Sequence, residues 1–325
     1  MRTTVGVIAI CLLLAGSLFA AGTEEQGKKA GKDIKMEIIC MGFQHEYWQT
    51  VRLGSEKAAK EIGIQVPFRG PELETQVDVQ IGMFENAMAK KVDGILLAPC
   101  DSEALVPLVD RATEQGIVVA TFDTDINKTD NRISFIATDN YAAGKLAGQN
   151  AGRILGGKGK VGIVGHLAPN QDTRERIGGF VDVIKAEFPG IQLLEPVYGD
   201  GDHQKSLDKA TDMMRAHPDL AAIYATNEGG AVGVALALEQ AKKVGQVKLI
   251  GFDSSEQEID YLKRGVIEGF VVQNPFQMGY LAVKTLYEHL AGIKQAPARI
   301  DTGVLWVDMD NFNDADIQKV LYPLK

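Results

Sequence analysis

The sequence predicts an α/β fold made of two doubly wound lobes, each with a parallel sheet covered by helices. Continuously apolar runs, such as "VDGILLAP" (residues 92–99) and "LAAIYATN" (residues 220–227), alternate with segments of helical periodicity. Strands that are apolar at every position are typical of parallel sheets buried on both faces, and right-handed crossovers then give doubly wound domains. The alternation starts at Met36 and starts again after residue 140, which indicates two lobes.

The first series of elements follows the apolar run at residues 37–41. Each later apolar run is followed by a segment whose apolar residues recur at helical spacing. We expect further apolar strand segments over residues 64–70, 92–100 and 117–123, and helices over residues 48–62, 74–91 and 102–116.

The second series follows the segment "RISFIATDN" (residues 132–140). Its strands and helices alternate in the same way. We expect helices over residues 141–156, 173–188, 203–217, 230–243 and 275–292, and strands over residues 160–166, 191–199, 220–227, 247–253, 269–274 and 303–310.

The helix over residues 275–292 has no lobe of its own in this order, so we expect it to return to the first lobe. The predicted N-terminal lobe therefore comprises residues 36–138 plus 274–301, and the C-terminal lobe residues 139–273 plus 302–325. The chain would cross between the lobes in three hinge segments, near residues 137–139, 273–274 and 301–303.

Residues 1–22 have the pattern of a secretory signal peptide. Arg2 precedes the apolar run "VGVIAICLLLAGSLF", and small residues at Ala20–Gly22 fit a cleavage site. The run is short for a membrane span, so an uncleaved anchor is the weaker alternative. Residues 23–35 are small and polar, which is typical of a flexible leader. We therefore expect an exported protein that works in the periplasm or elsewhere outside the cytoplasm.

Two cysteines, Cys40 and Cys100, remain beyond the predicted signal peptide. Export permits a disulfide between them, since both lie near the ends of predicted strands. The alternative is a pair of free, buried thiols that pack as small apolar side chains. The chain has no CxxC motif and no Cys/His cluster, so the sequence gives no support for a zinc site.

Composition and motifs exclude several classes of function. The formal net charge is −9 and no Lys/Arg cluster is present, which argues against a nucleic-acid partner. The glycine-rich segment at residues 156–165 precedes a strand, whereas a phosphate-binding loop follows one. The segment starting at Asp123 resembles a calcium loop but has Lys128 and Ser134 where that loop needs Gly and Glu. No nucleophile with a neighbouring base is evident, and we expect no metal and no cofactor.

Polar and aromatic side chains follow the strands of both predicted sheets. Ligands of open parallel sheets bind beyond the carboxyl ends of the strands. Carboxylates accept hydrogen bonds, guanidinium groups donate them and amides do both, while an aromatic ring covers the C–H face of a sugar. These residue types therefore predict a site for a polyhydroxylated ligand. The candidate ligand-binding residues are His45, Tyr47, Trp48, Asp123, Arg174, Asn227, Asp253 and Gln273.

Each candidate also has a purely structural interpretation. Asp253 and Asn227 could cap the helical segments that follow them. Arg174 could form a surface ion pair with Glu175 or Asp172, and Trp48 could be a core residue. The binding interpretation is favoured because all these residues fall at one edge of two predicted sheets.

The chain resembles the periplasmic sugar-binding proteins of ABC importers, of the ribose-binding type. The resemblance runs from Met36 to about Asp310 and rests on seven stretches in the same order. They are "HEYWQTVRLGSEKAAKEIG", "VDGILLAP", "ATDNYAAGKLAGQ", "TRERIGGF", "AHPDLAAIYATNE", "LIGFDSS" and "VVQNPFQMGYLAV". It implies that Tyr47 and Trp48 cover the sugar ring. It also implies contacts with hydroxyls or the ring oxygen at Asp123, Arg174, Asn227, Asp253 and Gln273.

Three positions depart from the pattern of ribose binders. His45 stands where they carry Asn, Thr124 where they carry Arg, and Gly201 where they carry Phe. One wall of the site is therefore expected to be open, unless Asp200, Asp202 or His203 lines that space. The departures argue against ribose and for a larger or differently substituted ligand, such as a pyranose, an amino sugar or a cyclitol.

The resemblance implies a protein that captures a monosaccharide, or a related polyol or cyclitol, between its lobes. The lobes would close on it without chemistry and deliver it to an ABC transporter permease, with a chemoreceptor as a further candidate partner. We expect a monomer. Within the same fold, a nucleoside or a furanosyl signal molecule is an alternative ligand. Less favoured alternatives are a ligand-sensing core of the lac-repressor type, which needs an N-terminal DNA-binding motif, and an enzyme using Asp123 and His45.

Overall fold

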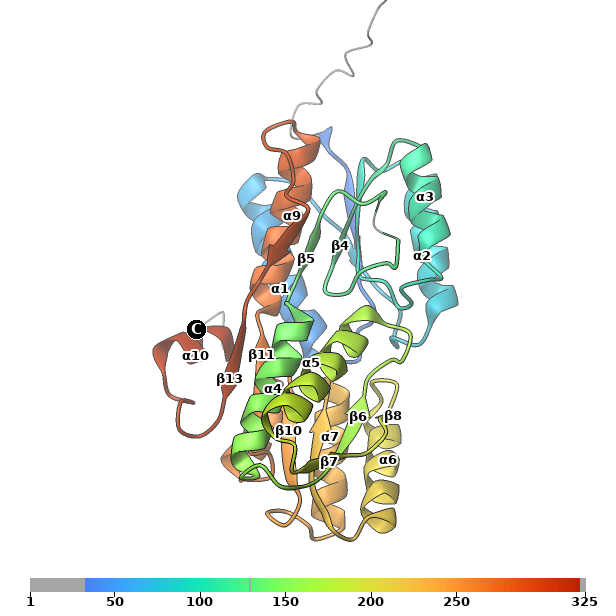
Figure 1. Ribbon diagram of the computed structural model, residues 1–325. Helices are drawn as coiled ribbons and strands as arrows, with labels where there is room; N and C mark the ends of the chain where they lie inside the picture. The colour runs from blue at the N-terminus through green and yellow to red at the C-terminus, as the bar shows by residue number, and fades with distance from the viewer. Residues whose placement is uncertain (1–32, 129, 322–325) are drawn as a thin grey trace, which may run out of the picture.

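The computed structural model describes residues 33–128 and 130–321, and they form two α/β lobes, one above the other (Figure 1). The predicted fold class is thereby confirmed. The first sheet has the strand order β12-β5-β4-β3-β1-β2, and the second has the order β13-β11-β10-β9-β6-β7, with β8 also paired to β6. All pairings are parallel except that of β13 with β11. The predicted signal peptide, residues 1–22, and nearly all of the predicted leader lie outside the described residues.

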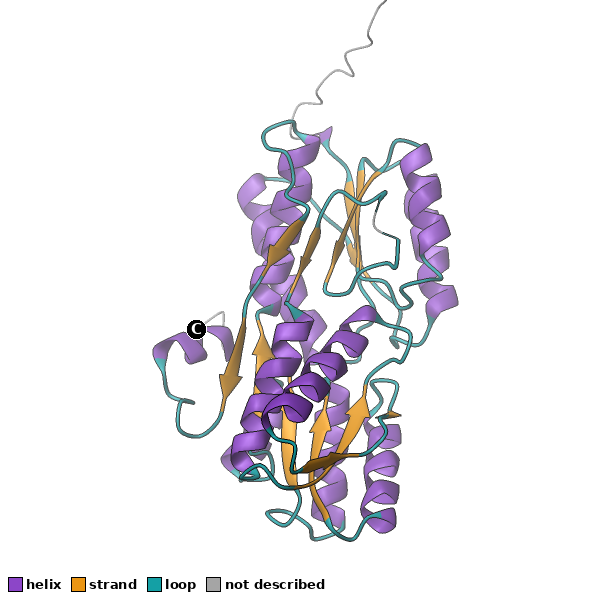
Figure 2. Ribbon diagram, viewed as in Figure 1, coloured by secondary structure: helices purple, strands orange, loops and turns teal. Residues whose placement is uncertain are grey.

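Helices cover both faces of the first sheet, whose strands are largely buried (Figure 2). Helices α1 and α9 pack together on one face and enclose one apolar cluster, while α2 and α3 enclose another on the opposite face. The strands are β1 (Met36–Ile39), β2 (Phe68–Arg69), β3 (Gly94–Leu97), β4 (Val118–Phe122), β5 (Phe135–Ala137) and β12 (Arg299–Asp301). The helices are α1 (Glu46–Ile62), α2 (Val77–Ala89), α3 (Val106–Glu114) and α9 (Pro275–Leu290).

The second sheet is covered in the same way. Helices α4 and α5 enclose one apolar cluster, and α6, α7, α8 and α10 enclose another. The strands are β6 (Gly159–Gly165), β7 (Ile191–Leu193), β8 (Val197–Tyr198), β9 (Leu220–Ala225), β10 (Lys248–Phe252), β11 (Gly269–Gln273) and β13 (Val304–Val307). The helices are α4 (Asn140–Ile154), α5 (Gln171–Glu187), α6 (His203–Ala216), α7 (Glu228–Gln240), α8 (Glu256–Lys263) and α10 (Ala315–Leu321).

The chain passes from one sheet to the other three times: between β5 and α4, between β11 and α9, and between β12 and β13. Helix α9 lies against α1 and against strands of the first sheet. The lobe boundaries given above, and the use of these crossings as hinges, remain predictions. Among the described residues, no helix is both long and apolar enough to cross a bilayer.

Some elements differ from the expected ones. The segment expected as one strand over residues 191–199 forms two short strands, β7 and β8, which both pair with β6. Pro196 lies between them and has no N–H to donate to a ladder. Strand β12 and helices α8 and α10 were not predicted. Helix α8 begins with a capping box, in which Ser255 and Glu258 bond each other's backbone N–H.

Cys40 and Cys100 are free and buried, as the alternative to a disulfide predicted. Their thiols donate to the carbonyl oxygens of Gly42 and Met41, at 3.3 and 3.2 Å. Burial raises the pKa of both thiols well above the usual range. Both side chains therefore act as small core residues.

Glycines allow one helix pair in each lobe to pack with close backbones. In the first lobe, a side chain at Gly54 of α1 would overlap the backbone of Phe276 in α9, and one at Gly279 would overlap the carbonyl of Val51. Helices α4 and α5 of the second lobe meet through Gly144 and Gly179 in the same manner. These contacts fix the helices against the sheets whose ends carry the site described next.

A methyl group at the α1–α9 crossing is expected to destabilise the first lobe. Gly54→Ala should lower the free energy of unfolding by about 1–3 kcal/mol, because the helix backbones must move apart. The matched control is Gly82→Ala in the exposed face of α2, where a Cβ meets nothing within 4 Å. That change should stabilise by about 0.5–1 kcal/mol. Urea unfolding measures the free energy of unfolding of both variants. Equal changes in Gly54→Ala and Gly82→Ala would contradict the close packing of α1 against α9.

Candidate functional site

A cavity lies between the lobes, where the carboxyl ends of the two sheets face each other. Its empty volume is about 300 Å³. From the first lobe it is lined by Met41, His45, Tyr47, Trp48, Glu74 and Asp123. From the second lobe it is lined by His166, Asp172, Arg176, Asn227, Glu228, Asp253 and Gln273. The structure thus brings together all the predicted site residues except Arg174.

Arg174 lies outside the cavity, and Arg176 occupies the place expected for it. The exposed guanidinium of Arg174 donates to the carbonyl of Pro169 and to Asn127 Oδ1. The buried guanidinium of Arg176 donates to Asn140 Oδ1 at 2.8 Å and to a backbone carbonyl at 2.9 Å. Two residues along a helix correspond to a rotation of about 200°, so only one of these arginines can face the cavity. The order of elements predicted the segment, but only the helix phase selects the residue.

Tyr47 and Trp48 form an aromatic corner at the start of α1. Their rings meet edge to face, with centroids 5.1 Å apart. The Tyr47 hydroxyl donates to Asp123 Oδ1 at 2.5 Å, and Trp48 Nε1 donates to Glu74 Oε1 at 2.7 Å. Trp48 is only 1% exposed and also packs edge-on against Phe122. Trp48 is therefore both a core residue and part of the cavity wall, as both interpretations predicted.

Two aspartates hold the same position in the two lobes. Asp123 follows β4 and Asp253 follows β10, and both have left-handed backbone conformations, with φ of 65° and 78°. Such values are uncommon for residues other than glycine and are often found at functional sites. The Asp253 carboxylate accepts from Glu228 N at 3.0 Å and from Gln273 Nε2 at 2.8 Å. This conformation turns both carboxylates toward the cavity.

The capping alternatives have different outcomes. The Asn227 side chain does cap α7 by accepting from Gly230 N at 3.1 Å, and it lines the cavity as well. Asp253 does not cap α8, because Ser255 holds that position. Asn227 therefore combines a structural role with its place in the site.

The sequence analysis missed several cavity residues. Glu74 belongs to the loop between β2 and α2, and His166 directly follows β6. Asp172 and Glu228 lie in the first turns of α5 and α7. The rule that sites form at strand ends could have identified His166. Glu74 follows a two-residue strand at the edge of the first sheet, and nothing in its local sequence marks it.

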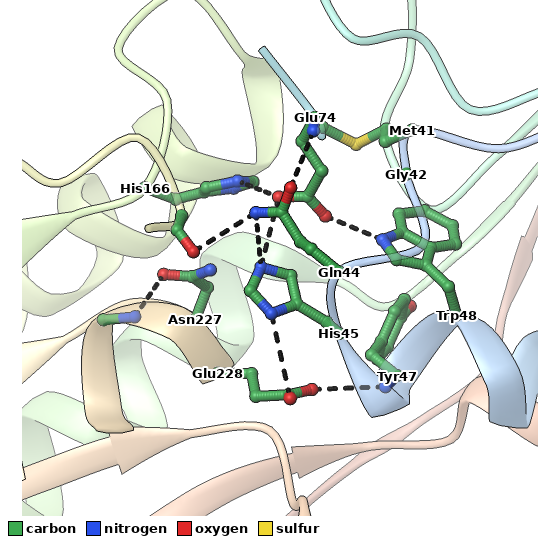
Figure 3. A network of polar contacts seen from close by, with 12 residues as sticks. Met41, Gly42, Gln44, His45, Tyr47, Trp48, Glu74, His166, Asn227 and Glu228 are labelled. Atoms are coloured by element: carbon green, nitrogen blue, oxygen red, sulfur yellow. Dashed lines mark hydrogen bonds and ion pairs between the residues drawn. The ribbon is translucent and has the colours of Figure 1, made fainter. Parts of the chain in front are cut away.

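The space that Gly201 leaves open is not filled by the side chains considered above. Asp200 pairs with Lys205 at 2.9 Å, and Asp202 caps α6 by accepting from Lys205 N at 2.7 Å. The His203 ring lies 6.0 Å from that of His45 but is not part of the cavity lining. Thr124 is buried and does not line the cavity either. Glu74 and His166 lie beside Gly201 instead. Figure 3 shows these two side chains facing each other.

Glu74 and His166 form a buried ion pair between the lobes. Glu74 Oε2 lies 2.7 Å from His166 Nε2 and 3.5 Å from His45 Nε2. Burial alone would raise the pKa of Glu74, but the two histidines hold it well below its usual range. Burial alone would lower the pKa of His166, but Glu74 and Asp172 together raise it to about 10. Each group thus stabilises the charged form of the other.

Two further carboxyls have raised pKa values. Burial, reinforced by the charge of Asp172, raises the pKa of Asp123 to about 7. Burial likewise raises the pKa of Glu228 to about 7, although His45 opposes the shift. Burial in the cavity therefore favours the protonated forms of these two carboxyls, in contrast to Glu74.

Four buried polar atoms of the cavity residues have no hydrogen-bond partner. They are His45 Nδ1, His166 Nδ1, Asp172 Oδ1 and Gln273 Oε1. Both histidine nitrogens lie near a carboxylate of the second lobe, at 3.8 Å from Glu228 for His45 and 3.9 Å from Asp172 for His166. All four atoms remain available for a hydrogen bond to a ligand in the cavity. They include donors and acceptors, which suits hydroxyl groups because each hydroxyl both donates and accepts. No group of three or more His, Cys, Asp or Glu among the described residues is arranged to hold a metal ion.

Comparison with known proteins assigns the family. The model of the family "Periplasmic binding protein domain" matches residues 36–294. The chain belongs to this family. A D-ribose/D-allose-binding protein of Pseudomonas aeruginosa is 28% identical over 83% of this chain and 86% of its own.

Solved structures of the family are similar over almost their whole length. One is a solute-binding protein of an ABC transporter from Agrobacterium vitis with bound D-fucose. It is 36% identical, with a TM-score of 0.85, over 88% of this chain and 99% of its own. Another, from Agrobacterium radiobacter, is in complex with D-arabinose. It is 32% identical, with a TM-score of 0.84, over 89% of this chain and 98% of its own.

The ion pair predicts an unusual titration of His166. Its imidazole should stay protonated up to a pH of about 10 in the closed protein. Glu74→Gln should lower this pKa, because it removes the charge that stabilises the imidazolium. NMR titration of the histidine ring signals, assigned with His166→Gln, measures both values. An unchanged pKa in Glu74→Gln would show that Glu74 does not set the charge of His166.

Proposed function

We propose that this protein is an extracytoplasmic solute-binding protein that captures a monosaccharide between its lobes and delivers it to an ABC transporter permease. The observation that carries the proposal is the set of charged and amide side chains from both lobes that line the interlobe cavity beside Tyr47 and Trp48. A sugar offers hydroxyls to the polar atoms and a C–H face to the aromatic rings. Family membership and the predicted signal peptide support an exported binding protein.

Contacts between the lobes describe a closed form. The backbone N–H groups of Glu46 and Tyr47, at the start of α1, donate to the Glu228 carboxylate, both at 3.2 Å. In return, Glu46 Oε2 accepts from Glu256 N of the second lobe at 3.0 Å. These bonds join helix N-termini to carboxylates of the opposite lobe. A ligand that also bridges the lobes would shift the population toward this form, and hinging at the three crossings would open it.

The lining of the cavity and the ligands of similar structures support a single sugar ring. Carboxylates, an arginine and side-chain amides from both lobes line the cavity beside two aromatic rings. The similar structures hold D-fucose and D-arabinose. Thr124 and Gly201 depart from the ribose binders, and His166 and Asp172 add polar groups, so we expect a pyranose with hydroxyls that reach these two residues. A related polyol or cyclitol would satisfy the same groups.

The energy of such binding is sufficient. Hydrogen bonds to charged groups contribute about 1.5–3 kcal/mol each. A few such bonds from Asp123, Asp172 and Arg176, with burial of the ring and less the cost of ordering, reach the roughly −8 kcal/mol of a micromolar complex. No covalent step is needed, and the protein works by binding without chemistry.

Three alternatives stay distinguishable from this proposal. A nucleoside would need to stack its base against the aromatic corner of Tyr47 and Trp48. A ligand-sensing repressor would need a DNA-binding motif before residue 36. An enzyme using Asp123 and His45 would convert a sugar that the purified protein only binds under our proposal. Thermal-shift screening of pentoses, hexoses, amino sugars, inositols and nucleosides, with analysis of each hit for turnover, tests the nucleoside and enzyme alternatives, and a DNA-binding assay of the full chain tests the repressor alternative.

At a pH above 7, where the Asp123 carboxylate is charged, Asp123→Asn should weaken binding of the sugar found in that screen by at least about tenfold, because the charge-assisted hydrogen bond is lost. Calorimetry of the mature protein measures the affinity. The control is Asp110→Asn, a surface carboxylate of the same lobe that bonds Lys128 and Asn131. Equal affinities for Asp123→Asn and the wild type would remove Asp123 from the site.

Affinity should fall as the pH rises from 6 to 10. The pKa of His166 is about 10 in the closed form and should return towards 6.5 when the cleft opens. A pKa raised on closure adds stability to the closed form that is fully present below the open-form value and is lost as the pH approaches 10. Titration calorimetry across this range should show at least about a tenfold loss and proton uptake on binding near pH 8. Proton release would contradict the assignment.

A further inference from the structure

Gly201 is the position where a large side chain would collide with the interlobe ion pair. A Cβ at Gly201 would lie 2.8 Å from Glu74 Oε2 and 3.0 Å from the imidazole of His166. Gly201 also has a left-handed backbone, with φ of 68°. The end of the cavity at Gly201 is therefore occupied by groups of both lobes, Glu74 from the first and His166 from the second.

The Glu74 side chain is held by contacts on each of its oxygens. Oε1 accepts from Trp48 Nε1 in its own lobe, and Oε2 faces His166 Nε2 across the cleft, both at 2.7 Å. Figure 3 shows Glu74 between the indole and the imidazole, with Gln44 beside them. Glu74 is 3% exposed, so this end of the cavity is closed to solvent.

Gln44 completes the closure of this end. Its Oε1 accepts from Glu74 N at 2.9 Å, and its Nε2 donates to the Gly201 carbonyl at 3.3 Å. The same Nε2 lies 3.0 Å from His45 Nε2. One side chain of the first lobe thus fixes the Glu74 loop and touches the second lobe at Gly201.

We propose that Glu74 is a specificity-determining residue: with His166 it closes the Gly201 end of the cavity, so a sugar with an extra substituent at that end is excluded. This inference rests on the proposed function. The Gly201 end of the cavity is closed only when the lobes meet, because Glu74 and His166 come from different lobes. A bulky substituent would have to break a buried ion pair, which penalises the wrong ligand more than it helps the right one.

Two variants separate the shape of Glu74 from its charge. Glu74→Gln keeps the size of the side chain and an oxygen acceptor for Trp48, while it removes the ion pair. Glu74→Ala opens the end of the cavity. The control is Glu37→Gln, a buried carboxylate of the same lobe whose cationic partners, Arg69 and Lys90, also belong to that lobe.

The experiment measures the affinities of four sugars by calorimetry. D-fucose is compared with D-galactose, which adds a hydroxyl, and with the two methyl D-fucopyranosides, which add a methyl group. The wild type should bind D-fucose at least tenfold more tightly than at least one of the three substituted sugars. Glu74→Ala should reduce that preference at least tenfold, and Glu74→Gln should keep it while weakening all affinities. Glu37→Gln should change neither the preference nor the affinities.

The outcomes distinguish this inference from the proposed function. If Glu74→Ala weakens binding of every probe by the same factor, Glu74 does not determine specificity, although the protein still binds sugars. If the wild type binds none of these probes and no sugar in the thermal-shift screen, the proposed function fails and the inference fails with it.

Discussion

The direction of the strands is the constraint on which the site depends. All strands of a parallel sheet end at the same edge, so the residues that follow them gather there. In this protein two such edges face each other, because the chain passes three times between the sheets. Asp123 ends one sheet, and His166, Asp253 and Gln273 end the other. Groups that would be solvated on one isolated sheet become partners across the cleft, as Glu74 and His166 do.

The lobes meet through polar groups, whereas each lobe keeps its own apolar cores. Leu167 is the exception among the buried residues of the four apolar clusters of the described chain. It follows β6 in the second lobe but packs in the first-lobe cluster of α1 and α9. Replacing polar interlobe contacts with hydrogen bonds to water costs little free energy, so a closed form held by such contacts can open again. A carrier must release its cargo, and this division between apolar cores and a polar cleft is suited to release. The glycine-mediated helix pairs hold the helices of each lobe close together.

Closure also changes the charges in the cleft. His166 becomes a stronger base on burial beside Glu74 and Asp172, and Asp123 and Glu228 become weaker acids. These three shifts have the same sign, so protonation of His166, Asp123 and Glu228 stabilises the form in which they are buried, whereas the lowered pKa values of Glu74 and Asp172 act in the opposite direction at acidic pH. The buried Glu74–His166 pair selects one arrangement of the lobes, because a buried ion pair adds little net stability, yet leaving one of its charges buried without the other is costly.

The sequence by itself determined the fold class, the strand ends that carry the site and seven of its candidate residues. It could do so because apolar runs, helical periodicity and the residue after each strand are local features. Only the tertiary structure decided between Arg174 and Arg176, because the answer depends on the phase of α5 against the sheet. Only the tertiary structure showed that Glu74 and His166, 92 residues apart, close the space beside Gly201. A contact between two lobes leaves no local pattern in either segment, so the sequence alone does not reveal it.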